Sequence, residues 1–367
     1  MYFYNLLVIV VLPKIPGAGD DCLTIIFRGC TMSINIGIDL GTASIIIYTK
    51  NDGVILNEPS VAAVDRRTDK IVLIGQEANK VVGKTPGHIE IVKPLEDGVI
   101  SNYRRTREMV QYFIEKACGN RIIKPKVAIC VPAGVTNVES RAVVDAANAA
   151  GVRDIYLVEE PVAAALGAGI DLSRPDGKLI LDIGGGTADV AVLSLNGVVA
   201  KDSIKVGGQK FDQALIRHIR NAHGVLIGEK TAENAKIAIG SVHDISEEVV
   251  YTVKGRHIGT GLPKSIEINQ AEISTALFEY VHPIARMMQS ILEITPPELV
   301  ADISDSGIIL TGGGSMLRGM PEYLTSLLNV NTVLVDEPLL CVARGTGLFY
   351  DHLDKLTDGI INGTKYY

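Results

Sequence analysis

The sequence contains no tryptophan, and aromatic residues make up only 5% of it. Cysteines are few and odd in number: Cys22, Cys30, Cys118, Cys130 and Cys341. No C-x-x-C pair and no cysteine–histidine spacing occurs, so the pattern supports neither a zinc site nor a disulfide framework. We therefore expect a protein of a reducing cytoplasm.

Long apolar runs are also absent. The longest, residues 6–12, is far shorter than the ~20 residues that a transmembrane helix needs, and no basic segment precedes it as in a signal peptide. Lys and Arg number 35 against 42 Asp and Glu, a net charge of −7. This acidic balance argues against a protein that holds the nucleic-acid backbone.

The chain has enough hydrophobic residues to form a large core. Its 367 residues are 47% hydrophobic and 21% charged, which excludes wholesale disorder. At roughly 150 residues per domain, this length predicts two domains or one bilobed unit.

Residues 1–31 differ from the rest of the chain. They hold an apolar tract, a Pro-Gly break and two cysteines, without a clear period. We interpret Met32 as the true start and residues 1–31 as a start-site artefact. The alternative is an N-terminal membrane anchor, although the tract lacks the basic face of an amphipathic anchor.

From residue 34 the pattern alternates between strands and helices. Apolar runs predict strands over residues 34–39, 44–50, 127–131, 155–158 and 179–182. Helical spacing predicts helices over residues 103–118, 137–150, 161–169, 211–222, 231–241 and 271–293. The first residues of the second helix, Thr136 to Glu139, fit a capping box. This alternation predicts an α/β fold with parallel or mixed sheets.

An internal repeat divides the chain. The segment IGIDLGTAS at residues 36–44 is echoed by LILDIGGGTAD at residues 179–189. The aspartates of the two copies, Asp39 and Asp182, are 182 − 39 = 143 residues apart, which is about one domain. We therefore expect two related α/β domains that face each other.

Each copy of the repeat suits phosphate binding. Glycines let backbone N–H groups approach phosphate oxygens, and threonine hydroxyls add donors. Asp39 and Asp182, at the strand ends, are placed to hold Mg²⁺ through its retained waters. One such motif alone is at least as often a structural hairpin, but two copies a domain apart favour the phosphate site.

Three further features are ambiguous when taken singly. The glycine cluster at residues 312–315 could pack against a nucleoside or form a plain strand-to-helix turn. Glu233 and Lys236 are i, i+3 neighbours on a helix, where an ion pair is the ordinary interpretation. Glu160 precedes Pro161 at a helix start, where a carboxylate could orient a water or simply interact with the helix dipole.

Together these motifs resemble the superfamily of actin, sugar-kinase and heat-shock-chaperone ATPases and, within it, the MreB/Mbl family of bacterial actins. The likeness runs from about Met32 to about Leu356. It implies domain I at residues 32–178 with a subdomain inserted near 60–97, and domain II at 179–345 with one near 207–272. Residues 346–367 would form a C-terminal helix returning to domain I and a polar tail.

The resemblance also assigns roles, with ATP and Mg²⁺ as cofactors. Phosphate contacts would come from Gly41, Thr42, Ala43 and Ser44 and from Gly184, Gly185, Gly186 and Thr187. Nucleoside contacts would come from Glu233, Asn234, Ala235, Lys236, Gly312, Gly313, Gly314 and Ser315. Glu160 and Thr187 would be catalytic, and Asp39 and Asp182 would hold the metal. Ser44-Ile45 replaces the usual Asn-Thr, and Gln209 departs from a Gly-Gly-Asp, so we expect binding with slow hydrolysis.

A loop at residues 119–125 suggests membrane contact. Ile122 and Ile123 lie between Arg121 and Lys124, which suits insertion at an anionic bilayer, unless both isoleucines pack into the core. In the family the corresponding loop inserts into membranes.

The resemblance further implies homopolymeric paired filaments on the inner face of the cytoplasmic membrane. These would direct lateral cell-wall synthesis and maintain rod shape with elongation proteins such as MreC, MreD and RodZ. A sugar or acetate kinase of the same superfamily is the main rival, yet no acceptor pocket or base is recognisable. A chaperone would need a substrate domain after Gly347, and a cell-division relative of actin would need a C-terminal amphipathic helix.

Overall fold

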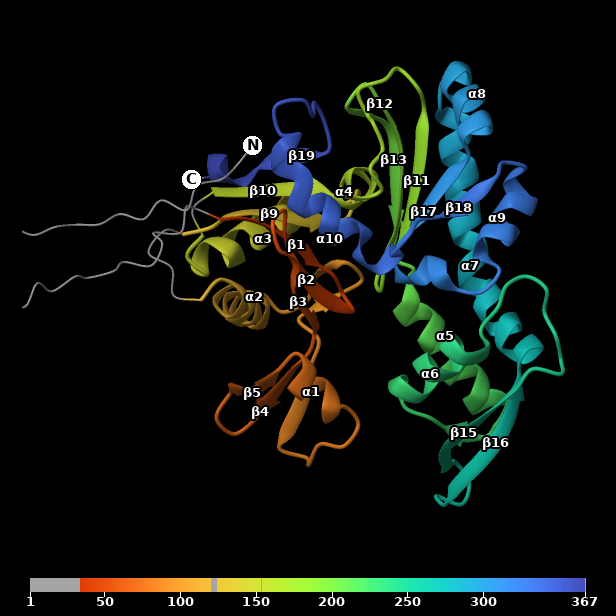
Figure 1. Cartoon of the computed structure of the whole chain (residues 1–367). Helices are drawn as coiled ribbons and strands as arrows, with labels where there is room; N and C mark the ends of the chain where they lie inside the picture. Colours follow the sequence, from red (N-terminus) through yellow and green to blue (C-terminus); the bar gives the residue numbers. More distant parts are fainter. Residues whose placement is uncertain (1–33, 120–123, 153, 367) are drawn as a thin grey trace, which may run out of the picture.

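The computed structural model describes residues 34–119, 124–152 and 154–366. The prediction for residues 1–31 lies outside these ranges. Two large halves stand side by side, and each carries a smaller unit on the same side of the molecule (Figure 1).

The first half is built on a mixed six-stranded sheet of order β19-β10-β9-β1-β2-β3. Its strands are β1 (Asn35–Leu40), β2 (Ser44–Thr49), β3 (Gly53–Pro59), β9 (Lys126–Val131), β10 (Asp154–Glu159) and β19 (Ile360–Asn362). Two helices, α2 (Tyr103–Cys118) and α3 (Asn137–Ala149), bury their apolar faces in the core of this half. The predicted capping box at Thr136 and Glu139 is confirmed at the start of α3.

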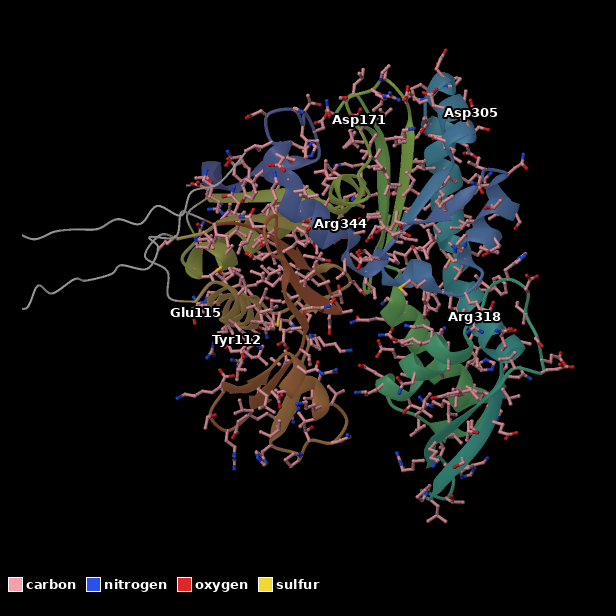
Figure 2. The ribbon with its side chains drawn as sticks, in the orientation of Figure 1. Tyr112, Glu115, Asp171, Asp305, Arg318 and Arg344 are labelled. Atoms are coloured by element: carbon pink, nitrogen blue, oxygen red, sulfur yellow. The ribbon has the colours of Figure 1, made fainter. Side chains whose placement is uncertain are left out.

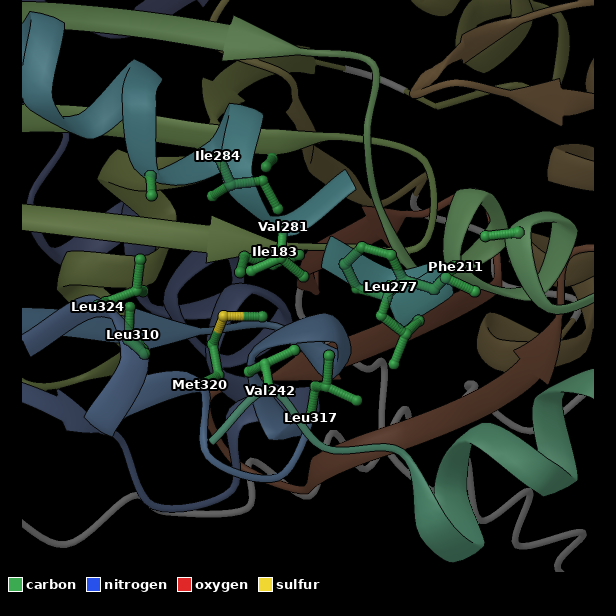
Figure 3. Close-up of a cluster of buried hydrophobic side chains, with 14 of the residues drawn as sticks. Ile183, Phe211, Val242, Leu277, Val281, Ile284, Leu310, Leu317, Met320 and Leu324 are labelled. Carbon is green, nitrogen blue, oxygen red and sulfur yellow. The ribbon is translucent and has the colours of Figure 1, made fainter. Parts of the chain in front are cut away.

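The second half is built on a five-stranded sheet of order β13-β12-β11-β17-β18. Its strands are β11 (Lys178–Ile183), β12 (Ala188–Ser194), β13 (Gly197–Ile204), β17 (Ile308–Thr311) and β18 (Thr332–Leu334). The same half also contains three helices, α7 (Gln270–Ile294), α8 (Pro297–Ser306) and α9 (Met320–Leu328), and the short turn η1 (Gly313–Met316). Ile183, Leu277 and Met320 meet in the core of this half (Figure 3).

The two sheets repeat one topology. In the first, β1 pairs antiparallel with β2 and parallel with β9. In the second, β11 pairs antiparallel with β12 and parallel with β17. The order β10-β9-β1-β2-β3 therefore matches β18-β17-β11-β12-β13 strand for strand. The predicted α/β class and the duplication are confirmed.

Two helices fill the space between the sheets: α4 (Glu160–Gly167) and α10 (Pro338–Leu348), which contact strands of both. Their backbones touch at glycines. A Cβ on Gly167 would lie 1.9 Å from the Cys341 carbonyl oxygen, and one on Gly345 would lie 1.7 Å from that of Ala163. No side chain fits at either position, so the small residues of α4 serve this close crossing. Arg344 of α10 accordingly lies near the centre of the molecule (Figure 2).

The smaller units carry their own sheets. Below the first half, β4 (Ala62–Asp65), β5 (Lys70–Ile74) and β6 (Ile89–Val92) form a sheet with α1 (Gln76–Lys80). Below the second half lie α5 (Gly208–His223), α6 (Glu229–Ile239) and a sheet of β14 (Val225–Leu226), β15 (Val250–His257) and β16 (Pro263–Asn269). A two-stranded hairpin of β7 (Leu95–Glu96) and β8 (Val99–Ile100) follows β6.

The C-terminal segment corrects one prediction. A helix was expected from residue 346, but α10 ends at Leu348 and is followed by the short turn η2 (Phe349–Asp351), then β19 and η3 (Gly363–Tyr366). Phe349 and Leu356 are buried, and β19 pairs antiparallel with β10. Gly359, at φ 73°, makes the turn into β19. The segment reaches the first half through β19 and through buried apolar side chains, not through a helix and a polar tail.

Candidate functional site

The two repeat turns meet across the halves. We call residues 41–44 the first loop and residues 184–187 the second loop. A Cβ on Gly186 would lie 2.5 Å from the Thr42 hydroxyl oxygen, and one on Gly185 would lie 2.8 Å from the Ala43 Cβ. Residues predicted to bind phosphate from both halves are therefore neighbours, and the second loop needs glycine because its backbone approaches the first so closely.

The β7–β8 turn touches both loops. Its residues Asp97 and Gly98 have φ values of 49° and 76°. The Gly98 N–H donates to the Thr42 hydroxyl at 3.0 Å, and a Cβ on Gly98 would lie 2.5 Å from the Thr187 methyl carbon. No role of this turn in the site was predicted from the sequence.

Four carboxyl groups gather next to the loops, two from each half. Asp39 and Glu160 belong to the first half; Asp182 and Asp189 belong to the second, where they stand opposite each other on β11 and β12. Glu160, Asp182 and Asp189 are at most 9% exposed. Burial in one low-dielectric region therefore dominates their electrostatics.

Burial raises the pKa of Asp39 to about 6, against the lowering effect of a hydrogen bond from the Cys130 thiol at 3.2 Å. The pKa of Glu160 is raised well above its usual range by burial and then by the charges of Asp189, Asp182 and Asp39. Burial and the charges of Asp189 and Asp39 do the same to the pKa of Asp182. Such a cluster favours a bound cation, which would offset the repulsion.

The residues fit Mg²⁺ better than a metal held by protein alone. Asp182 Oδ1 is buried without a hydrogen-bond donor. Within the described ranges, no group of three or more His, Cys, Asp or Glu side chains is arranged to hold a metal ion. Mg²⁺ usually takes one or two carboxylates and completes its shell with waters and substrate phosphates. Asp39 and Asp182, the predicted pair, suit that role.

The predicted nucleoside contacts on α6 divide into two kinds. Glu233 and Asn234 are exposed, whereas Ala235 packs in the core of the second half and offers no side chain to a ligand. Lys236 pairs with Asp212 of α5, Nζ to Oδ1 2.8 Å, and donates to the Gly208 carbonyl oxygen at 3.2 Å. Lys236 is therefore fixed by α5 and not by its helical neighbour Glu233.

The glycine cluster after β17 packs behind the second loop. Gly312 has a φ of 84°, and a Cβ there would lie 2.4 Å from the Ile183 carbonyl oxygen and 2.9 Å from Asp182 Oδ1. The buried Ser315 hydroxyl donates to the Thr311 carbonyl oxygen at 2.6 Å. Gly313 and Gly314 lie between them in η1, so backbone is what this turn offers to a ligand.

The contacts that join the two halves were not predicted from the sequence. Lys93 Nζ lies 2.5 Å from Glu229 Oε2, and Lys210 Nζ lies 3.4 Å from Asp97 Oδ1. Asp189 is the last residue of the second repeat copy, and no role was predicted for it. A carboxyl group between the apolar residues of β12 was the one signal that could have singled it out.

The membrane prediction concerns residues that the structure does not describe, since Ile122 and Ile123 lie in the gap between 119 and 124. Among the described residues, no helix has the length and apolar character needed to cross a membrane.

Comparison with known proteins agrees with this architecture. The family model described as MreB/Mbl protein matches residues 33–358. The cell shape-determining protein Mbl of Bacillus subtilis is 43% identical over 323 residues, which are 88% of this chain and 97% of the relative. The cell shape-determining protein MreB of Escherichia coli is 43% identical over 336 residues, 89% of this chain and 96% of the relative.

A crystal structure of MreB5 of Spiroplasma citri bound to ADP superposes with a TM-score of 0.84 at 36% identity, covering 88% of this chain and 98% of that one. The fold, with its duplicated halves, is therefore actin-like. The chain belongs to the MreB/Mbl family of cell shape-determining proteins.

Proposed function

We propose that this protein binds ATP with Mg²⁺ between its halves, hydrolyses it slowly and polymerises into membrane-associated filaments. One observation carries the nucleotide part: two glycine–threonine loops from different halves meet beside four carboxyl groups, three of them buried, with Gly186 and Thr42 in contact. The MreB5 relative, solved with ADP and also with AMPPNP, supports the same ligand class here.

In this proposal, the backbone N–H groups of both loops and the hydroxyls of Thr42 and Thr187 bind the phosphates. Bound Mg²⁺ would neutralise phosphate charge at Asp39 and Asp182. Glu160 orients a water molecule whose oxygen bonds to the γ-phosphorus while the bond to the β–γ bridging oxygen breaks. The products are ADP and inorganic phosphate, and one proton is released.

Family membership and the sequence support the proposal of a filament and of its location at the membrane. Filaments of this chain would lie on the inner face of the cytoplasmic membrane and direct lateral cell-wall synthesis with elongation proteins such as MreC, MreD and RodZ. Ile122 and Ile123 between two cations would supply a weak membrane contact in each subunit. Many copies in one filament would convert it into stable binding by avidity.

The test is electron microscopy of the full chain on anionic lipid monolayers, with Mg-ATP and without nucleotide. Lipid-bound paired filaments that require ATP are expected. The double variant Ile122→Ser/Ile123→Ser should keep filaments in solution but lose them from lipid. Ile237→Ser, at an exposed isoleucine of α6, is the matched control and should behave as the unaltered chain does.

Filaments of the double variant that stay on lipid would reject the loop and keep the polymer. Absence of filaments under every condition, with ATP bound, would reject the polymer. In that case a panel of sugars and acetate would be tested for phosphate transfer, which a small-molecule kinase predicts.

A further inference from the structure

The second loop is bound on one side by the first turn of α5. The Gly208 N–H donates to the Gly184 carbonyl oxygen at 3.0 Å. The Gln209 N–H donates to the Gly185 carbonyl oxygen at 2.9 Å. Both donors lie in the first turn of α5, where N–H groups have no partner within the helix. Two backbone donors of α5 therefore bind two consecutive carbonyl groups of the second loop.

These bonds fix the direction of two further N–H groups. In a planar trans peptide, the carbonyl oxygen of one residue and the N–H of the next point in opposite directions. None of the peptide bonds among the described residues is cis. The N–H groups of Gly185 and Gly186 consequently point away from α5. Neither donates a hydrogen bond to another described residue, so both are available to an acceptor that binds between the halves.

The close approach of α5 to the second loop depends on Gly207, the N-cap residue of α5. A Cβ there would lie 2.7 Å from the Gly184 carbonyl oxygen and 2.8 Å from the Gly185 carbonyl carbon, so no side chain fits. Lys236 of α6 restrains the same turn, since its Nζ donates to the Gly208 carbonyl oxygen at 3.2 Å. The first turn of α5 is therefore a firmly held support for the second loop.

We propose that Gly208 and Gln209 are positioning residues that direct the N–H groups of Gly185 and Gly186 at the phosphates of the bound nucleotide. A peptide group that accepts a hydrogen bond at its carbonyl oxygen becomes a stronger donor at its N–H. Gln209 acts through its backbone, so its departure from the family pattern leaves this role intact. This inference rests on the proposed binding of ATP and adds the element that orients one of its loops.

The variant Gln209→Pro tests this role, because proline removes the N–H and is tolerated in the first turn of a helix. Gln209 is the second residue of α5, and α4 and α9 already carry proline at their second residues. The measurement is calorimetric titration of the full chain with Mg-ATP and with adenosine. We expect the affinity for ATP to fall about tenfold or more and that for adenosine to stay within about twofold, because only phosphates meet the second loop.

Two further variants separate loss of the N–H from other effects. Gln209→Ala removes the side chain and keeps the N–H, so its affinity for ATP should stay within about twofold of that of the unaltered chain. Val138→Pro, at the second residue of α3, is the matched control for proline in a first helical turn and should bind ATP like the unaltered chain. The Val138 side chain is 80% exposed and lies outside the site. Thermal midpoints show whether each variant folds.

An unchanged affinity for ATP in a folded Gln209→Pro would overturn the proposal. Equal losses for ATP and adenosine would also overturn it, because they indicate general damage to the site. The same loss in Gln209→Ala would assign the effect to the side chain and reject the backbone role.

Hydrogen exchange of the unaltered chain gives a readout that needs no variant, and it decides the matter if Gln209→Pro fails to fold. The amides of Gly208 and Gln209 should exchange slowly with and without nucleotide, whereas those of Gly185 and Gly186 should become protected only with Mg-ATP. Exchange at Gly185 and Gly186 that bound ATP does not slow would overturn the proposal. If the chain binds no ATP, the proposed nucleotide site fails, while protection of Gly208 and Gln209 still decides whether α5 holds the loop.

Discussion

Lys93 and Glu229, 136 residues apart in the sequence, are joined by an ion pair with Nζ 2.5 Å from Oε2. Lys93 follows β6 in the small unit of the first half, and Glu229 is the first residue of α6 in that of the second. Together with Lys210 and Asp97, this pair ties the two halves together on the side of the small units.

Loss of the Lys93–Glu229 pair should speed nucleotide release. The side chains are 29% and 54% exposed, so the pair contributes no more than about 1 kcal/mol, or roughly fivefold in rate. Stopped-flow release of a fluorescent ATP analogue from Lys93→Ala would measure this, and the swap Lys93→Glu/Glu229→Lys should restore slow release. Lys80→Ala, which breaks a pair within α1, is the control. Unchanged release in Lys93→Ala would contradict the prediction.

Gly186→Ala should weaken ATP binding. The new Cβ would lie 2.5 Å from the Thr42 hydroxyl oxygen and 2.6 Å from the Gly98 nitrogen, so the loops must separate. We expect affinity to fall about tenfold or more in calorimetric titration. Gly87→Ala, where a Cβ meets nothing within 4 Å, should bind like the unaltered chain. Full affinity in Gly186→Ala would show that the two loops need not touch to bind the nucleotide.

The nucleotide-free protein should be less stable at pH 7.5 than Asp39→Asn. Burial raises the pKa of Asp39 from 3.8 to about 6, so the folded state binds more protons than the unfolded state between these values. Stability from this group is present below pH 4 and is lost as the pH rises through about 6, by up to about 3 kcal/mol.

Urea unfolding at several pH values would measure the difference in free energy between the unaltered chain and Asp39→Asn. That difference should grow from pH 4.5 to pH 7.5. Asp305→Asn, at an exposed aspartate of α8, should show no such trend. With Mg-ATP present, the unaltered chain should be more stable than Asp39→Asn, since Asp39 then has a cation beside it. A difference that is constant with pH would refute the assignment of this pKa.

Tyr350→Phe should stabilise the protein. The Tyr350 hydroxyl is buried, has no hydrogen-bond partner among the described residues, and burial raises the pKa of this side chain. The ring packs against Tyr156 and Phe349, and phenylalanine keeps those contacts. Removal of the unpaired hydroxyl should add about 1 kcal/mol to the free energy of unfolding. Tyr103→Phe, at an exposed ring, should have no effect, and a less stable Tyr350→Phe would reveal a partner for the hydroxyl.

Much of the fold could be predicted because it depends on local patterns. Helix α2 has the predicted bounds Tyr103–Cys118, and the capping box at Thr136 needs only four consecutive residues. The repeat that contains Asp39 and Asp182 predicted two matching sheets, because adjacent residues determine a hairpin and its turn. The C-terminal strand β19 escaped prediction because its partner β10 lies about 200 residues earlier in the chain.

For the site, the sequence by itself determined the chemistry: glycines and threonines in two turns, with an aspartate at the end of each preceding strand. Tertiary structure decided which of these groups meet. The glycine crossing of α4 and α10 brings the halves close enough for Gly186 to touch Thr42 and for Asp189 to bind Ala133. No sequence pattern in either segment predicts such contacts, because they arise from the packing of the two halves against each other.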